Sequence, residues 1–457
     1  MTAVDWRAYF AEQEDANLEE LYDFLRIPSV SALPENAGDV RRAAEWVAAR
    51  MQRSGIPEVE VLETGGHPLV FGKWHVDDRK PTALIYAHYD VQPPDPIDLW
   101  QTPPFEPTVR DGKIYARGSG DDKAGLFITL LAIEGFAKQH GQPPVNLVFF
   151  YEGEEEIGSP SIAPYLTAHA DKFAADVVIS ADGMMWGEDQ YSLILSSKGM
   201  AGGQIDIITA DSDAHSGIYG GGVANAARVT ARIAASFHDA NGKVAVEGFY
   251  DKVLPITEQQ AADIENVPFD EKAFLGSIGV TAPTGEADYT TLERLWMRPT
   301  IDINGIWSGF QGEGSKTVTP AQGHIKITCR LVPDQNPDEI NDLIRLHVEQ
   351  HLPAGARAEF QLKTGTARPF SISRDNPFMV AAAETLTEVG GKDVVYVRTG
   401  GTIPIAEVFK QHLGAEMVFY AFSLETCNAH APNEFFRIED FRNGAVATVA
   451  YLERLAK

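Results

Sequence analysis

The chain has 457 residues, of which 44% are hydrophobic and 23% charged, a composition typical of a globular protein with more than one domain. Its formal net charge of −27 at pH 7 argues against nucleic acids and membranes as partners, because both attract positive protein surfaces. The apolar runs are too short to span a membrane, and the first residues lack the basic head and apolar core of a signal peptide. We therefore expect a cytoplasmic protein, with Cys329 and Cys427 as buried thiols.

The first part of the chain predicts helices followed by alternating strands and helices. Apolar spacing predicts one helix that continues to Leu25 and a second from Val40 to Met51. Short apolar runs then predict buried strands of an α/β sheet, and a further helix begins just after Lys123. The clearest strand runs are residues 83–86, 145–151, 176–180, 394–397 and 417–420.

The middle of the chain has a different pattern. Residues 204–209 and 325–331 alternate apolar and polar side chains, as strands with one buried face do, and helices are predicted over 224–237 and 337–352. We expect a small α+β domain at 199–365, inserted into a larger α/β domain made of 1–198 and 366–457. Within the insert, residues 238–300 are irregular, and the sequence assigns them no role.

Imidazoles and carboxylates gather where the predicted strands end, which is where ligands bind in open α/β sheets. Each one alone has an ordinary explanation, such as a helix cap or a surface turn. Together at one sheet edge, so many carboxylates would repel one another strongly without cations. The set comprises His88, Asp90, Asp121, Asp122, residues 152–156, Asp182 and His430.

This donor set predicts a metal site. It contains histidine and carboxylates but no thiolate, which suits Zn²⁺ and also Mn²⁺ or Co²⁺. Two imidazoles with several carboxylates can hold a pair of ions that share a bridging carboxylate. Phosphate-binding glycine motifs and a Gly-x-Ser-x-Gly nucleophile elbow are absent from the sequence, which argues against nucleotide binding and serine hydrolysis.

Six segments in order along the chain resemble the co-catalytic metallopeptidases, the family of carnosinase-type dipeptidases, aminoacylases, succinyl-diaminopimelate desuccinylase and glutamate carboxypeptidases. The segments are residues 86–93, 116–123, 152–159, 180–182, 213–217 and 429–434. The likeness is strongest to the dipeptidases of that family. It implies a catalytic α/β domain with a central mixed sheet, a phosphorylase/hydrolase-like sandwich, and an inserted α+β ferredoxin-like lid and dimerisation domain.

The resemblance also implies a role for each matched residue at the metal centre. Glu155 would be the general base, and Asp90 would orient a metal-bound His88. A cis peptide bond is expected between Asp121 and Asp122. The implied ligands of the two divalent ions are His88, Asp121, Glu156, Asp182 and His430, with Asp121 bridging.

Residues outside the metal centre are assigned in the same way. His215 would reach across a homodimer and stabilise the oxyanion in the partner's active site. Arg330 would offer its planar guanidinium to a substrate carboxylate, and the glycine-rich loop with Gly401 and Thr402 would receive that same carboxylate.

The resulting hypothesis is a dinuclear peptidase that hydrolyses dipeptides with a free C-terminal carboxylate, using a metal-bridging water activated by Glu155. One alternative keeps the metals but acts on N-acyl amino acids, as an aminoacylase, desuccinylase or carboxypeptidase. Another is a metal-binding scaffold without turnover, which the presence of Glu155 beside Glu156 disfavours.

Overall fold

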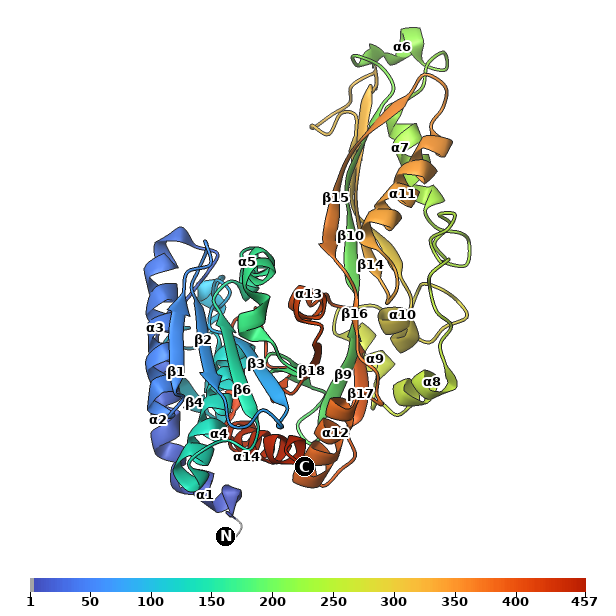
Figure 1. The fold of residues 1–457 in the computed structure, drawn as a ribbon. Coiled ribbons are helices and arrows are strands. Elements are labelled where there is room, and N and C mark those ends of the chain that lie inside the picture. Colours follow the sequence, from blue (N-terminus) through green and yellow to red (C-terminus); the bar gives the residue numbers. More distant parts are fainter. Residues whose placement is uncertain (1–3) are drawn as a thin grey trace. The chain divides into compact units, whose positions relative to one another are not determined.

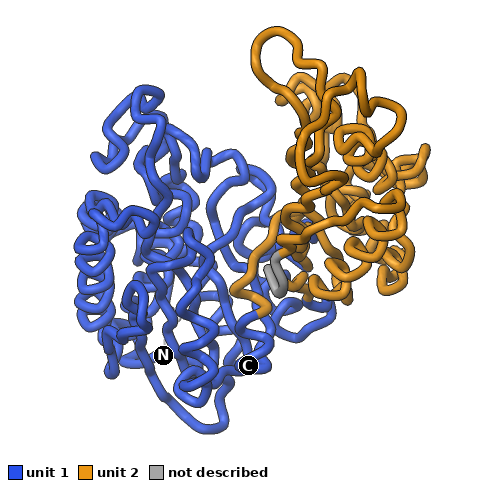
Figure 2. The backbone as a smooth tube through the Cα atoms, turned by 90° about the horizontal axis from the view of Figure 1, so that it is seen from above, with its two compact units in different colours: residues 1–195, 372–396, 408–457 blue, residues 196–371, 397–407 orange. Residues whose placement is uncertain are grey.

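The computed structural model describes residues 4–457, apart from the side chains of 363–366, and it divides into two compact units (Figure 2). Unit 1 extends to Leu195 and includes residues 372–396 and 408–457, whereas unit 2 comprises 196–371 and 397–407. Residues 397–407, which the sequence placed in the larger domain, thus group with unit 2. The reason is local: the Gly401 carbonyl accepts a hydrogen bond from the Lys198 N–H at 2.9 Å.

Unit 1 is built on a six-stranded mixed sheet, which confirms the expected fold class (Figure 1). The pairings β1/β2 and β2/β6 are antiparallel, and those beyond β6 are parallel. In sheet order the strands are β1 (Glu58–Leu62), β2 (Leu69–Trp74), β6 (Asn146–Glu152), β3 (Thr82–His88), β7 (Val177–Ser180) and β18 (Glu416–Phe419).

One predicted strand of this sheet was wrongly assigned. The run at 394–397 forms β17 (Val395–Thr399), which belongs to a separate three-stranded sheet with β9 (Ser192–Ser197) and β16 (Phe370–Ser371). Its Val395 N–H donates to the carbonyl of Tyr191 at 3.1 Å. An apolar run predicts a buried strand but does not say which sheet the strand joins.

Helices cover one face of the six-stranded sheet, where α4 (Ala124–His140) and α14 (Ile438–Leu455) lie side by side (Figure 1). The Phe127 ring of α4 stacks on the Phe441 ring of α14. The expected first helix is two helices, because at Gln13 the backbone leaves helical geometry and its N–H bonds to the Phe10 carbonyl in a tighter turn. The helices of unit 1 are α1 (Trp6–Glu12), α2 (Glu14–Leu25), α3 (Ala37–Arg53), α4 (Ala124–His140), α5 (Ile162–His169), α12 (Pro377–Gly390) and α14 (Ile438–Leu455).

Aromatic side chains form the packing layer on the opposite face of the sheet. Phe71, Tyr86 and Phe150 lie opposite one another in the strand register, so all three project from the same face. Phe173 and Phe409 pack edge-on against the Phe150 ring, each with ring centroids 5.0 Å apart. With side chains packed on both faces, the polar residues that follow β3 and β7 are left at the strand ends.

Unit 2 has the βαββαβ order of a ferredoxin-like fold. The four strands of its main sheet are all antiparallel, in the order β12-β14-β10-β15, and its core contains the buried Cys329. Cys427, in unit 1, is also a buried free thiol, as expected. The elements are β10 (Gly199–Ile208), α7 (Ala226–Ser236), β12 (Thr300–Ser308), β14 (Gln322–Leu331), α11 (Pro337–His351) and β15 (Arg357–Ala367).

The 238–300 insertion contains three short helices, α8 (Glu258–Glu265), α9 (Glu271–Gly276) and α10 (Thr291–Met297). The side chains of Thr257 and Thr290 close capping boxes at α8 and α10, so local sequence defines where these helices begin. Arg298, just after α10, donates from Nε to the Glu286 Oε1 at 3.2 Å and from Nη2 to the Oε2 at 2.8 Å, a bidentate pair. The segment that looked irregular in sequence is therefore ordered by its caps and by this ion pair.

Within residues 4–457, no helix has the length and apolarity needed to cross a membrane. The remaining helices, helical turns and strands complete the chain. They are η1 (Pro34–Asn36), η2 (Ile97–Leu99), η3 (Ser119–Lys123), η4 (Glu155–Ile157), η5 (Ala170–Phe173), α6 (Ser216–Tyr219), α13 (Pro404–Leu413), β4 (Thr108–Arg110), β5 (Lys113–Tyr115), β8 (Met184–Met185), β11 (Ala214–His215), β13 (Val318–Thr319), β19 (Ser423–Leu424) and β20 (Phe435–Arg437).

Candidate metal centre

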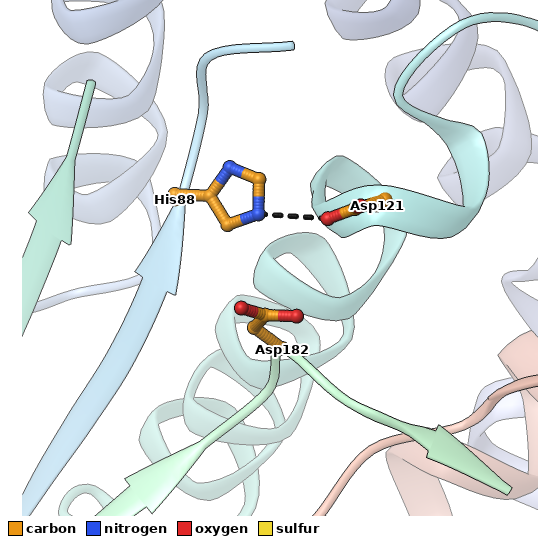
Figure 3. Close-up of side chains that lie close together, drawn as sticks. All are labelled: His88, Asp121 and Asp182. Carbon is orange, nitrogen blue, oxygen red and sulfur yellow. Dashed lines mark hydrogen bonds and ion pairs between the residues drawn. The ribbon is translucent and has the colours of Figure 1, made fainter. Parts of the chain in front are cut away.

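The first group of candidate ligands comprises His88, Asp121 and Asp182 (Figure 3). His88 ends β3, and Asp182 follows β7, the parallel neighbour of β3, so both side chains emerge at the same edge of the sheet. Asp121 lies in η3 and brings its Oδ1 to 2.9 Å from the His88 Nε2. One ligand atom from each residue lies within 4.8 Å of the other two, close enough for a single ion.

A second group comprises Asp121, Glu156 and His430. The His430 Nε2 lies 3.0 Å from the Asp121 Oδ2 and 3.0 Å from the Glu156 Oε2. Asp121 therefore belongs to both groups and turns one carboxylate oxygen toward each imidazole. A carboxylate shared in this way is what a pair of neighbouring ions requires.

The backbone around Asp121 is held by Glu434. The buried Glu434 carboxylate accepts hydrogen bonds from the N–H groups of Gly118, Gly120 and Asp121, at 2.8 to 3.0 Å, and from the Arg117 side chain. The Asp121–Asp122 peptide bond is cis, as expected. Nothing in a sequence pattern pairs Glu434 with residues 118–121, so its role as a support for Asp121 could not be predicted from the sequence.

Asp90 contacts both the His88 ring and the turn that carries Glu155 and Glu156. Its carboxylate Oδ1 lies 3.4 Å from the His88 Nδ1, and its backbone carbonyl lies 3.1 Å from the same nitrogen. The carboxylate also accepts the N–H groups of Glu155, at 3.3 Å, and Glu156, at 3.1 Å. One buried side chain thus orients an imidazole and fixes the turn that carries two glutamates.

The donor chemistry of His88 fits a cation. With Nδ1 donating to Asp90, the neutral imidazole presents the lone pair of Nε2 to the Asp121 carboxylate, which is also an acceptor. Two acceptors at 2.9 Å need a proton or a cation between them. A divalent ion bound by histidine and carboxylates satisfies this requirement, so the residues present fit a metal.

The electrostatics of the site also fit a metal. Burial and the nearby Asp121 raise the pKa of Asp182 to about 7, and burial raises the pKa of Glu155 well above its usual range. Hydrogen bonds to Asp121 and Glu156 raise the pKa of His430 to about 10. The protein alone does not provide enough positive charge to keep the Asp182 and Glu155 carboxylates ionised at their usual pKa. Divalent cations would supply that charge.

Besides Asp90 and Glu155, three further carboxylates of the predicted cluster lie outside both ligand groups. Glu152 is buried and accepts a hydrogen bond from the Tyr86 hydroxyl at 2.9 Å, and burial raises its pKa to about 8. Glu154 accepts the N–H groups of His67 and Ser161, so it holds loops together. Asp122, which is also buried, appears in neither group of ligand atoms.

The remaining predicted residues lie in unit 2. Arg330 Nη1 donates to the Thr402 Oγ1 at 2.7 Å, and the Gly401 N–H donates to the Thr399 Oγ1 at 3.0 Å. The structure therefore brings Arg330 to the glycine-rich turn, although 72 positions separate it from Thr402. His215, in β11, is exposed, and its Nδ1 accepts the Gly217 N–H at 2.9 Å.

Comparison with known proteins agrees with this geometry. Residues 84–454 match the model of the peptidase family M20/M25/M40. The chain belongs to this family. It is 28% identical to the Cys-Gly metallodipeptidase DUG1 of Candida albicans, over 96% of this chain and 94% of that protein. It is 27% identical to the human Beta-Ala-His dipeptidase, over 98% of this chain and 92% of that protein.

A solved structure supports the same assignment. The M20 family metallo-carboxypeptidase Sso-CP2 of Sulfolobus solfataricus superposes with a TM-score of 0.81 and is 30% identical, covering 96% of this chain and 99% of that one. This member of the family is therefore a metallopeptidase, a hydrolase, with candidate ligands for two metal ions at one edge of its sheet.

Proposed function

We propose that this metallopeptidase hydrolyses dipeptides that have a free C-terminal carboxylate, at a centre that holds two divalent ions. The observation that carries the proposal is the shared carboxylate of Asp121, which turns one oxygen to His88 and the other to His430. The dipeptide substrate is supported by the similarity to DUG1 of Candida albicans and to the human Beta-Ala-His dipeptidase, which are both dipeptidases.

His88, Asp121 and Asp182 would hold one ion, and Asp121, Glu156 and His430 the other. When bound, the ions supply positive charge that polarises a carbonyl and makes a water more acidic. Nitrogen and oxygen donors without thiolate favour Zn²⁺, Mn²⁺ or Co²⁺.

Glu155 is proposed as the general base. Its N–H is held by Asp90, and it immediately precedes the candidate ligand Glu156, so its carboxylate belongs to the same turn as the metal centre. It would take a proton from the attacking water as the new C–O bond forms. It would then pass that proton to the leaving amine nitrogen as the C–N bond breaks.

Recognition of the substrate carboxylate is assigned to Arg330, Gly401 and Thr402. The guanidinium of Arg330 is anchored to the Thr402 hydroxyl, which leaves its other N–H groups to form a planar fork for a carboxylate. This assignment explains why the substrate would need a free C-terminus.

His215 is proposed to act in a homodimer, on the oxyanion in the partner's active site. Because its Nδ1 accepts the Gly217 N–H, the neutral ring carries its proton on Nε2, where it can donate. Sedimentation that shows a strict monomer at assay concentrations would remove this role. A cytoplasmic location stays a prediction from the sequence.

The test is a substrate panel of free dipeptides, N-acyl amino acids and N-succinyl amides, each assayed with added Zn²⁺ or Mn²⁺. Cleavage of dipeptides that disappears in Glu155→Gln is the expected result. Cleavage confined to acylated amino acids would overturn the dipeptide assignment and favour the amidohydrolase alternative.

A further inference from the structure

The turn at residues 398–402, which carries the proposed carboxylate-binding residues Gly401 and Thr402, is held by the 238–300 insertion. Three contacts within unit 2 connect the insertion or its end to the turn and its neighbours. The first contact comes from α8, and the other two come from α10 and the residue that follows it, so two separate parts of the insertion hold the turn.

The first contact is a buried ion pair. The Arg398 Nη2 lies 3.7 Å from the Asp263 Oδ2, and both side chains are less than 5% exposed. Asp263 projects from α8 and also accepts a hydrogen bond from the Gln259 side chain at 3.0 Å. A guanidinium removed from water needs a counter-charge. Asp263 of α8 supplies that charge and so stabilises the buried Arg398 at the start of the turn.

The second contact is made by Lys198, a residue that is only 3% exposed. Its Nζ donates to the carbonyls of Arg294, at 3.1 Å, and Arg298, at 2.6 Å, at the end of α10 where carbonyls lack helical partners. Its backbone N–H donates to the Gly401 carbonyl at 2.9 Å. The N–H of Thr402, in the same peptide unit as that carbonyl, must then point away from Lys198.

The third contact is steric. A Cβ added to Gly400 would lie 3.1 Å from the Leu295 carbonyl oxygen of α10, closer than a side chain ordinarily approaches. The turn therefore packs directly against α10, the helix whose end accepts hydrogen bonds from Lys198. A cavity of about 590 Å³ adjoins these groups, and its lining includes Lys198, Arg298, Arg330 and Gly400.

We propose that the 238–300 insertion positions the 398–402 turn for recognition of the substrate carboxylate, with Asp263 and Lys198 as positioning residues. Neither residue needs to touch substrate, because each acts through the turn. This inference rests on the proposed function, in which Arg330, Gly401 and Thr402 bind that carboxylate. It gives the insertion a role in specificity for a free C-terminus.

The test compares a dipeptide with the same dipeptide amidated at its C-terminus, assayed with the intact metal-loaded enzyme. In Asp263→Asn, kcat/KM for the acid relative to the amide is expected to fall roughly tenfold through a higher KM for the acid. Lys198→Met should lower the same ratio by an independent route. Glu265→Gln, which removes an exposed carboxylate from the same helix, is the matched control and should leave the ratio unchanged.

Arg330→Met separates this inference from the function on which it rests. If Arg330→Met lowers the ratio but Asp263→Asn and Lys198→Met do not, the positioning role is overturned and the proposed carboxylate site stands. If Arg330→Met leaves the ratio unchanged, both proposals fail. An equal loss of activity toward acid and amide in the two positioning variants, with the ratio unchanged, indicates general damage to the unit and also overturns the inference.

Discussion

The Glu434 carboxylate accepts the backbone N–H of Asp121 at 3.0 Å, so a residue near the end of the chain holds the aspartate that both ligand groups share. The same carboxylate receives two further N–H groups from the η3 region. The position of the shared ligand thus depends on a side chain that is not itself a candidate ligand.

We expect Glu434→Gln to weaken metal binding by about 10–100-fold, which is the usual effect of removing a residue that orients a metal ligand by hydrogen bonding. The amide NH₂ would face backbone N–H donors, and Arg117 would lose its buried counter-charge. Titration with Zn²⁺ or Mn²⁺ in a calorimeter measures the affinity, with the exposed Glu12→Gln as control. Wild-type affinity in Glu434→Gln would show that η3 is held without this carboxylate.

Replacing the shared ligand should affect both ions. Asp121→Asn removes charge from both groups, so metal content should fall for the pair, whereas His430→Gln should reduce chiefly the ion bound with Glu156. Elemental analysis of dialysed protein gives the number of ions per chain. Loss of the same single ion in both variants would contradict the shared-carboxylate arrangement.

Glu155→Gln should keep the metals and lose turnover, because the variant retains the candidate ligands but cannot accept a proton. General bases contribute about 10²–10⁴-fold to rate, so kcat should fall within that range. Glu156→Gln is the matched comparison, since it changes the adjacent residue and should lose metal as well. A Glu155→Gln enzyme with most of its wild-type rate would remove Glu155 from the mechanism.

His347 makes the stability of unit 2 depend on pH. Burial and the neighbouring His351 lower the pKa of His347 to about 4, and its Nε2 lies 2.8 Å from the Ser236 Oγ. The unfolded chain, with a histidine pKa near 6.5, binds the proton more readily. His347 therefore favours the fold above about pH 6.5, and this advantage is lost as the pH falls toward about 4.

We expect His347→Gln to unfold with a smaller dependence on pH over that window. Urea unfolding of both proteins at several values between about pH 7.5 and pH 4 measures the difference in free energy of unfolding. Parallel curves for wild type and variant would show that other groups cause the acid sensitivity.

Local patterns in the sequence predicted several parts of the centre. His88 and Asp182 follow apolar runs that form parallel strands, and the ends of such strands meet at one edge of a sheet. The two predicted helices of unit 2 are present as α7 and α11, because amphipathic spacing reports the face that a helix buries. The resemblance to a known peptidase family, carried by short motifs, anticipated the family that the comparison shows.

Other features depended on contacts between distant residues, which no periodicity records. Glu434 supports η3 across 313 positions, β17 joins a small sheet rather than the central one, and residues 397–407 group with unit 2. The sequence by itself determined which side chains could bind metal, since residue type and strand exits are local properties. The resemblance had already implied that Asp121 is shared, but only the tertiary structure decided what holds it, because hydrogen bonds between remote segments form only when the chain is folded.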